Sequence, residues 1–101
     1  MTQSVIHQPR VAWDAALAFV RAAGGPGYDA FAGQVLDRLG AELGDELGHT
    51  RMRLLQAAAA TSDRFTHDVE AGKWRVRLED LLRTNPALTT PLRELTESAT
   101  R

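Results

Sequence analysis

The chain has 101 residues, 44% hydrophobic and 25% charged, a length and balance that predict one folded domain and exclude an intrinsically disordered protein. Twelve basic and thirteen acidic side chains give a formal net charge of −1. This argues against a nucleic-acid partner, because nucleic-acid-binding domains normally carry a basic excess. The sequence contains no cysteine, so disulfides and thiolate metal sites are excluded.

The same composition bears on location and origin. The N-terminal residues lack the apolar run of a signal peptide, and no run of about 18 apolar residues occurs, so we expect a cytoplasmic protein with no membrane segment. Arginine outnumbers lysine eleven to one and alanine is the commonest residue, which is typical of proteins from high-GC bacteria. Alanine buries little apolar area, at roughly 25 cal/mol per Å², so we expect a thin core that a partner could complete.

The first predicted helix begins at Pro9 and ends near Ala23. Proline suits the first turn of a helix, where its missing N–H is not needed. We assign residues 1–8 to a flexible arm, since termini are poorly ordered unless they are tied down. The glycine- and proline-rich segment 24–27 ends the helix. The spacing i, i+4, i+7 places three bulky residues on one face: Trp13, Leu17 and Val20.

The second predicted helix spans residues 28–48 and carries two adjoining stripes when it is plotted at about 100° per residue. The leucines of the first stripe, which we expect to pack inward, are Leu36, Leu39, Leu43 and Leu47. The glycines of the second stripe are Gly33, Gly40, Gly44 and Gly48. Four glycines cost a helix about 3–4 kcal/mol of propensity relative to alanine, so tertiary packing has to offset that loss.

The glycine stripe has two interpretations, of which we prefer the first, and the sequence does not exclude the second. Inside a bundle, the stripe lets a neighbouring helix come closer than the usual separation of about 8–10 Å. On the surface, it forms a docking site for a second chain, with Asp37 as a specificity contact. The candidate interaction residues are therefore Gly33, Asp37, Gly40, Gly44 and Gly48, together with Trp74, whose indole is the best candidate for an energetic anchor.

The end of the second helix and the organisation of residues 51–83 are less well determined. Gly48 favours a left-handed position after a helix and Thr50 can cap the next one, which favours a break there over a bend through Gly44 and Gly48. Residues 51–83 are helical in pattern. The polar segment 61–63 competes with the helix backbone, so the region is compatible with one helix or with two.

The C-terminal half carries an apolar stripe that we expect to close the core: Trp74, Leu78, Leu82, Leu92 and Leu95. Asn85 and Pro86 suit the N-cap and first position of the last helix, with Pro91 as an alternative start. We assign residues 96–101 to a flexible tail. No alternating apolar pattern predicts a strand, so the expected fold class is all-α, a small bundle of three to five helices forming a single domain over residues 1–101.

Groups that could carry out catalysis or bind a cofactor are sparse. The three histidines, His7, His49 and His67, are not spaced at i, i+3 or i, i+4, and HExxH is absent, so we expect no metal site. Segment 24–27 lacks the Gly-Lys-Ser/Thr ending of a phosphate-binding loop. We therefore predict that the protein is not an enzyme and uses no cofactor.

The main alternative function is that of a small DNA-binding transcriptional regulator. It would rest on two Arg-x-Arg pairs, Arg51 with Arg53 and Arg75 with Arg77. Residues at i, i+2 on a helix point about 160° apart, so neither pair forms a single basic patch, and we prefer a solvated face.

The run Trp74, Leu78, Leu81, Leu82, Pro86, Leu88, Leu92 and Leu95 resembles the C-terminal helical hairpin of small adaptor or effector-associated modules in conflict-type signalling systems of high-GC bacteria. The resemblance implies a helical, non-catalytic module that accompanies NTPase, caspase-like or repeat-containing partners. The chain departs from such modules at residues 89–91 and has no amyloid-like segment after Leu95. We therefore predict a protein–protein interaction module, an adaptor or regulatory subunit, whose partner is another protein or a second copy of itself.

Overall fold

The computed structural model describes residues 8–60 and 64–99, and all the regular secondary structure within them is helical. This confirms the predicted all-α bundle. The elements are α1 (Gln8–Ala23), α2 (Tyr28–Leu39), α3 (Ala41–Ala60), α4 (Arg64–Thr84), the short 3-10 turn η1 (Pro86–Leu88) and α5 (Thr89–Ala99). None of the helices in this part of the chain combines the length and hydropathy that a bilayer crossing demands.

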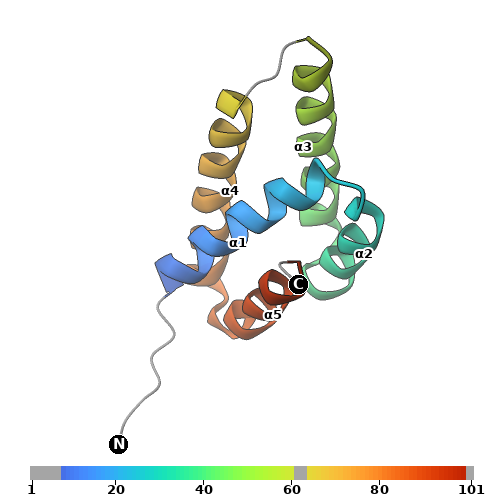
Figure 1. Ribbon diagram of the computed structural model, residues 1–101. Helices are drawn as coiled ribbons and strands as arrows, with labels where there is room; N and C mark the ends of the chain where they lie inside the picture. Colours follow the sequence, from blue (N-terminus) through green and yellow to red (C-terminus); the bar gives the residue numbers. More distant parts are fainter. Residues whose placement is uncertain (1–7, 61–63, 100–101) are drawn as a thin grey trace, which may run out of the picture.

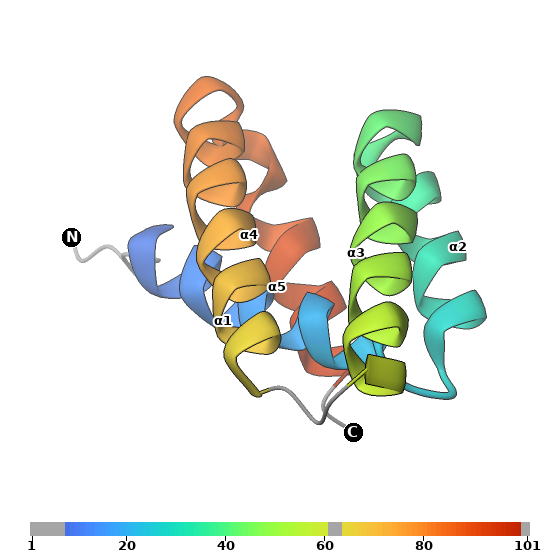
Figure 2. The same cartoon turned by 90° about the horizontal axis from the view of Figure 1, so that it is seen from above.

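Helix α1 lies across the molecule and contacts each of the other four α-helices. In Figure 1, α4 stands on the left and α3 on the right, α1 runs across from α4 to α3, and α2 lies beside α3. Figure 2 shows the α2–α3 pair on one side of the molecule and α4 and α5 on the other. Helix α1 therefore joins the two sides, and α3 and α4 contact each other less extensively than α1 contacts α4.

Alanine, not the bulky residues, forms most of the buried face of α1. The residues on that face are Ala12, Ala15, Ala16, Phe19 and Ala23, all fully buried. Of the three bulky residues that share a face of this helix, Val20 is buried, whereas Trp13 and Leu17 are exposed, so they lie at the edge of the core and not inside it. Small side chains let α1 lie close to α4, and Phe19 fills the centre through edge-on contacts with Phe31 and Trp74, at ring-centroid distances of 5.1 and 5.0 Å.

The predicted helix over residues 28–48 is in fact broken at Gly40. Gly40 has φ +104°, a left-handed conformation that favours glycine, and its N–H donates to the carbonyls of Val35 and Leu36 at 3.2 and 3.1 Å. The next helix, α3, then runs without interruption through Gly44 and Gly48. The favoured break at Gly48 is therefore wrong, because the one glycine with positive φ lies eight residues earlier in the chain.

The break changes how the leucine stripe packs. Leu43 and Leu47 on α3 are buried, as predicted, and Leu39 is half-buried. Leu36 is exposed, so its predicted inward position is wrong. The predicted stripe assumes one continuous helix. Leu36 lies on α2 and Leu43 and Leu47 lie on α3, so the three residues do not share a helix axis.

The C-terminal half agrees more closely with the sequence. The five residues predicted to close the core, Trp74, Leu78, Leu82, Leu92 and Leu95, are all buried. The region 51–83 holds parts of two helices, α3 and α4, and the polar segment 61–63 lies outside the described residues. Asn85 and Pro86 open η1, and α5 begins at Thr89, before the alternative start at Pro91.

The predicted ends differ slightly from the observed helices. Helix α1 begins at Gln8, inside the predicted arm, and residues 1–7 lie outside the described range. Helix α5 continues to Ala99, so the predicted tail from residue 96 is largely helical, and residues 100–101 are not described.

Candidate interaction surface

Helix α4 is apolar on two opposite faces. Its inner face packs against α1 and contributes Ala71, Trp74, Leu78 and Leu82 to the core. Its opposite side carries Phe65, Val69, Gly72 and Val76, which we call the α4 outer face. These four residues are spaced 4, 3 and 4 apart and fall within about 60° of one another on a helix.

The α4 outer face is open to solvent. Phe65 is 73% exposed, Val76 59% and Val69 40%. A side chain added at Gly72 would meet nothing within 4 Å, so a shallow depression lies at the middle of the face. Its rim is charged and is lined by further α4 residues, among them Lys73, Glu79 and Asp80. A surface helix usually has one apolar stripe, directed to the core, so the second stripe makes this face a candidate contact surface.

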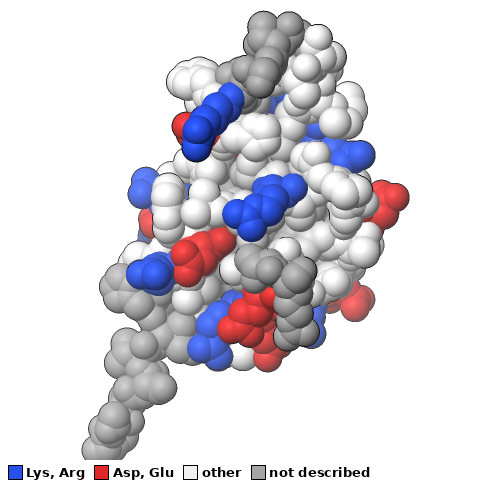
Figure 3. Space-filling model, in the orientation of Figure 1, with Lys and Arg blue, Asp and Glu red and all other residues white. Residues whose placement is uncertain are grey.

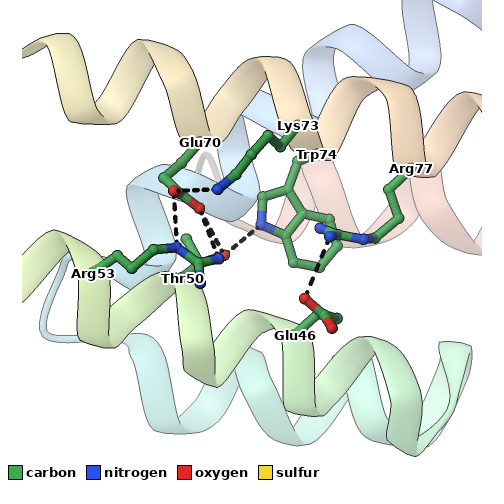
Figure 4. Close-up of polar contacts among 7 residues, drawn as sticks. All are labelled: Glu46, Thr50, Arg53, Glu70, Lys73, Trp74 and Arg77. Atoms are coloured by element: carbon green, nitrogen blue, oxygen red, sulfur yellow. Dashed lines mark hydrogen bonds and ion pairs between the residues drawn. The ribbon is translucent and has the colours of Figure 1, made fainter.

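A buried polar cluster lies on the side of α4 that faces α3 (Figure 4). The Glu70 side chain is only 3% exposed, and it accepts two hydrogen bonds from Arg53 of α3, from Nε at 2.9 Å and from Nη2 at 3.1 Å. Lys73 Nζ lies 2.9 Å from the same carboxylate. Burial raises the pKa of Glu70, but the hydrogen bonds and charges of Arg53 and Lys73 outweigh it and hold the pKa below its ordinary value of 4.5.

The same cluster satisfies the only polar atom of Trp74. The indole Nε1 donates to Thr50 Oγ1 at 2.8 Å, and this hydroxyl lies 3.4 Å from Glu70 Oε1, to which it donates. Thr50 and Trp74 are both fully buried. No buried side-chain nitrogen or oxygen among the described residues lacks a hydrogen-bond partner. The cluster is therefore an ionised structural link that fixes the distance between α3 and α4.

The four arginines of the DNA-binding alternative are engaged within the chain. Their contacts are Arg51 with the Ala23 and Gly25 carbonyls and the Tyr28 ring, Arg53 with Glu70, Arg75 with Glu79 and the Trp13 ring, and Arg77 with Glu46 and the Trp74 ring. On the side drawn in Figure 3, basic and acidic side chains are interspersed. This arrangement does not favour a phosphate-binding surface.

The residues predicted from the glycine stripe do not form one surface. Gly44 and Gly48 face α2: an added Cβ would lie 3.8 Å from Leu36 Cβ and 3.3 Å from Tyr28 Oη. These two glycines are thus internal, between α2 and α3. Gly33 and Gly40 have open space around them and Asp37 is exposed, whereas Trp74 is at the centre of the core.

Two of the three histidines, His49 and His67, lie in the described residues, and His7 lies outside them. Within residues 8–60 and 64–99, no three histidines or acidic residues are arranged to hold a metal ion. Sequence reasoning missed the α4 outer face because it described residues 51–83 only as helical in pattern and did not separate Phe65 and Val69 from the stripe that contains Trp74. The sequence does contain a sign of this face, because Val69 and Val76 point away from Trp74 on a helical projection.

Comparisons with known proteins do not add a family. No family model, curated protein or solved structure matches the chain.

Proposed function

We propose that the protein is a non-catalytic protein–protein interaction module, acting as a cytoplasmic adaptor or regulatory subunit, whose contact surface is the α4 outer face. The observation that carries this proposal is the exposure of Phe65, Val69 and Val76 in one line, directly opposite the buried Trp74 and Leu78. An exposed apolar stripe lowers its free energy when it is covered, at roughly 25 cal/mol per Å².

The shape of the face fits an α-helix as the covering element. Spacings of 4, 3 and 4 are those of the contact seam between two packed helices, where side chains of one helix enter the spaces of the other. Gly72 leaves such a space at the centre of the seam. The ion pair between Glu70 and Arg53, with Lys73 beside it, holds α4 against α3. The α4 outer face therefore lies on a helix whose position is fixed. The resemblance to adaptor modules is consistent with this role.

The proposal is tested by affinity capture with matched baits. Val76→Asp places a charge on the α4 outer face. Val76 is 59% exposed and is not part of the hydrophobic core. Met52→Asp makes the same change on α3, at a side chain that is also 59% exposed. Circular dichroism and thermal melts are used to check that the wild type, Val76→Asp and Met52→Asp are folded.

We expect wild type and Met52→Asp to recover the same proteins from a high-GC bacterial lysate, and Val76→Asp to lose them. Isotope-labelled mass spectrometry gives the ratios. Equal recovery by wild type and Val76→Asp would show that the α4 outer face is not the contact surface.

A further inference from the structure

We propose that the occupant of the α4 outer face is the same face of a second copy of this chain, with the two α4 helices antiparallel. This inference rests on the proposed function, because it names the partner of that surface. It follows from the symmetry of the face and from the charges beside it.

The sequence of side-chain sizes along α4 is self-complementary when one helix is reversed. In the antiparallel register that pairs Phe65 with Val76 of the second copy, Val69 meets Gly72 of the second copy, and the same two contacts repeat across the two-fold axis. Each layer then joins a larger side chain to a smaller one, which fills space evenly. The depression at Gly72 receives Val69 of the second copy.

The charged residues beside the face fit the same register. Asp68 and Arg75 lie on one flank of the stripe, and in an antiparallel helix pair equivalent flanks face each other. The register places Asp68 opposite Arg75 of the second copy, twice per dimer. Asp68 forms no ion pair within residues 8–60 and 64–99, and the link from Arg75 to Glu79 is long, at 3.9 Å. Arg75 also lies 5.7 Å from the centroid of the Trp13 ring, so the contact with Asp68 of the second copy would replace two loose contacts within the chain.

A parallel pairing of the same faces is less favourable. It would stack Gly72 on Gly72 and leave a void between two valine layers. It would also bring Glu79 against Glu79 of the second copy, because Glu79 continues the stripe. The flank residues that a parallel pair would use, Lys73 and Asp80, already pair with Glu70 and Arg83 at 2.9 and 2.8 Å.

The size of the contact sets the expected affinity. From Phe65 to Val76 the seam is about 17 Å long at 1.5 Å per residue. One helix from each copy buries less than the roughly 1,200 Å² of stable complexes, so we expect a dissociation constant of about 10 μM or weaker. Such a dimer is half-formed only at high protein concentration.

Sedimentation equilibrium between about 5 μM and 1 mM tests the association. We expect the weight-average mass of the wild type to rise from 11.1 kDa towards twice that value. Val76→Asp weakens association at least tenfold, and Met52→Asp leaves it unchanged. A wild type that stays monomeric at the highest concentration, or equal effects of the two variants, would overturn the proposal.

Charge reversal tests the antiparallel register. Asp68→Arg alone and Arg75→Asp alone each create two like-charge contacts per dimer, and each weakens self-association by roughly threefold to tenfold. Mixing these two variants gives a heterodimer in which both cross-copy pairs are again opposite in sign, so association recovers to the wild-type level. In a parallel dimer the mixture would not recover, and that result would refute the register.

Failure of this inference is distinguishable from failure of the proposed function. A wild type that remains monomeric, while lysate capture still depends on Val76, excludes the second copy as the occupant and leaves the interaction module standing. If neither self-association nor capture depends on Val76, both proposals fall.

Discussion

Glu70 offers the sharpest test of how the bundle is held together. Glu70→Gln keeps the shape of the side chain and removes its charge, while Arg53 and Lys73 stay in place beside it. We expect the variant to fold with the same helical content and a lower melting temperature, because the carboxylate is the common acceptor for donors from α3 and α4.

The magnitude follows from the exposure of the two cations. Removing one partner of a buried ion pair costs about 3–5 kcal/mol when the other charge stays buried. The Arg53 and Lys73 side chains are 41% and 47% exposed, so water hydrates them once the carboxylate is gone. The cost therefore falls to that of the lost charge-assisted hydrogen bonds, about 2–3 kcal/mol. For a domain of this size that lowers the melting temperature by about 10–15 °C.

The matched control is Asp80→Asn on the same helix. Asp80 and Arg83 form an ion pair of 2.8 Å, but both side chains are about two-thirds exposed, so its loss costs about 0.5 kcal/mol or less. Differential scanning calorimetry of the three proteins gives the comparison. A shift for Glu70→Gln no larger than that for Asp80→Asn would refute the view that the buried cluster stabilises the fold.

The pH dependence of the same pair of proteins is an independent check. The folded protein holds the pKa of Glu70 below the 4.5 of the unfolded chain, so the ionised form favours folding. This contribution is complete above pH 4.5 and is lost as the pH falls through the lower folded value. The melting-temperature difference between wild type and Glu70→Gln should therefore be largest at neutral pH and shrink in acid.

Four further variants test single positions by urea denaturation. Thr50→Val removes the acceptor of the Trp74 N–H without changing volume and should cost about 1–3 kcal/mol, whereas Thr50→Ser should cost less because it keeps the hydroxyl. Gly40→Ala should cost about 1–2 kcal/mol, because alanine is strained at φ +104°, and an unchanged midpoint would contradict this. Gly44→Ala should stabilise by about 0.5–1 kcal/mol, because its Cβ would lie at ordinary contact distance from Leu36, and a loss of stability would show that the α2–α3 contact requires glycine there.

The sequence was informative wherever large apolar residues recur at helical spacing and one face of a helix is clearly apolar. The stripe from Trp74 to Leu82 predicted the inner face of α4, and Leu92 and Leu95 predicted that of α5. The glycine- and proline-rich segment 24–27 ended α1 as expected. In each case local propensity and tertiary packing favour the same arrangement, so pattern alone was sufficient.

The errors arose where packing chose between residues of similar propensity. Gly40, Gly44 and Gly48 lie on the same side of a helical projection, which does not show that the chain turns at Gly40 while Gly44 and Gly48 face α2. On α1, the spacing of Trp13, Leu17 and Val20 does not show which face is buried, because a close contact with α4 favours small side chains, and the alanines are inside while Trp13 is outside. Neither choice is visible until the neighbouring helix is placed.

The exposure of the α4 outer face depends on how α4 is rotated against the core. Phe65 and Val76 belong to the same helix as Trp74, and a count of apolar residues along α4 cannot separate them. Their exposure follows only once Trp74 is fixed inward, which the hydrogen bond from its indole to Thr50 requires. Because α4 cannot turn its outer residues inward without leaving the indole N–H and the Glu70 carboxylate unsatisfied, the apolar outer face is enforced by the polar cluster. The same contacts that stabilise the monomer therefore keep the apolar α4 outer face exposed to solvent.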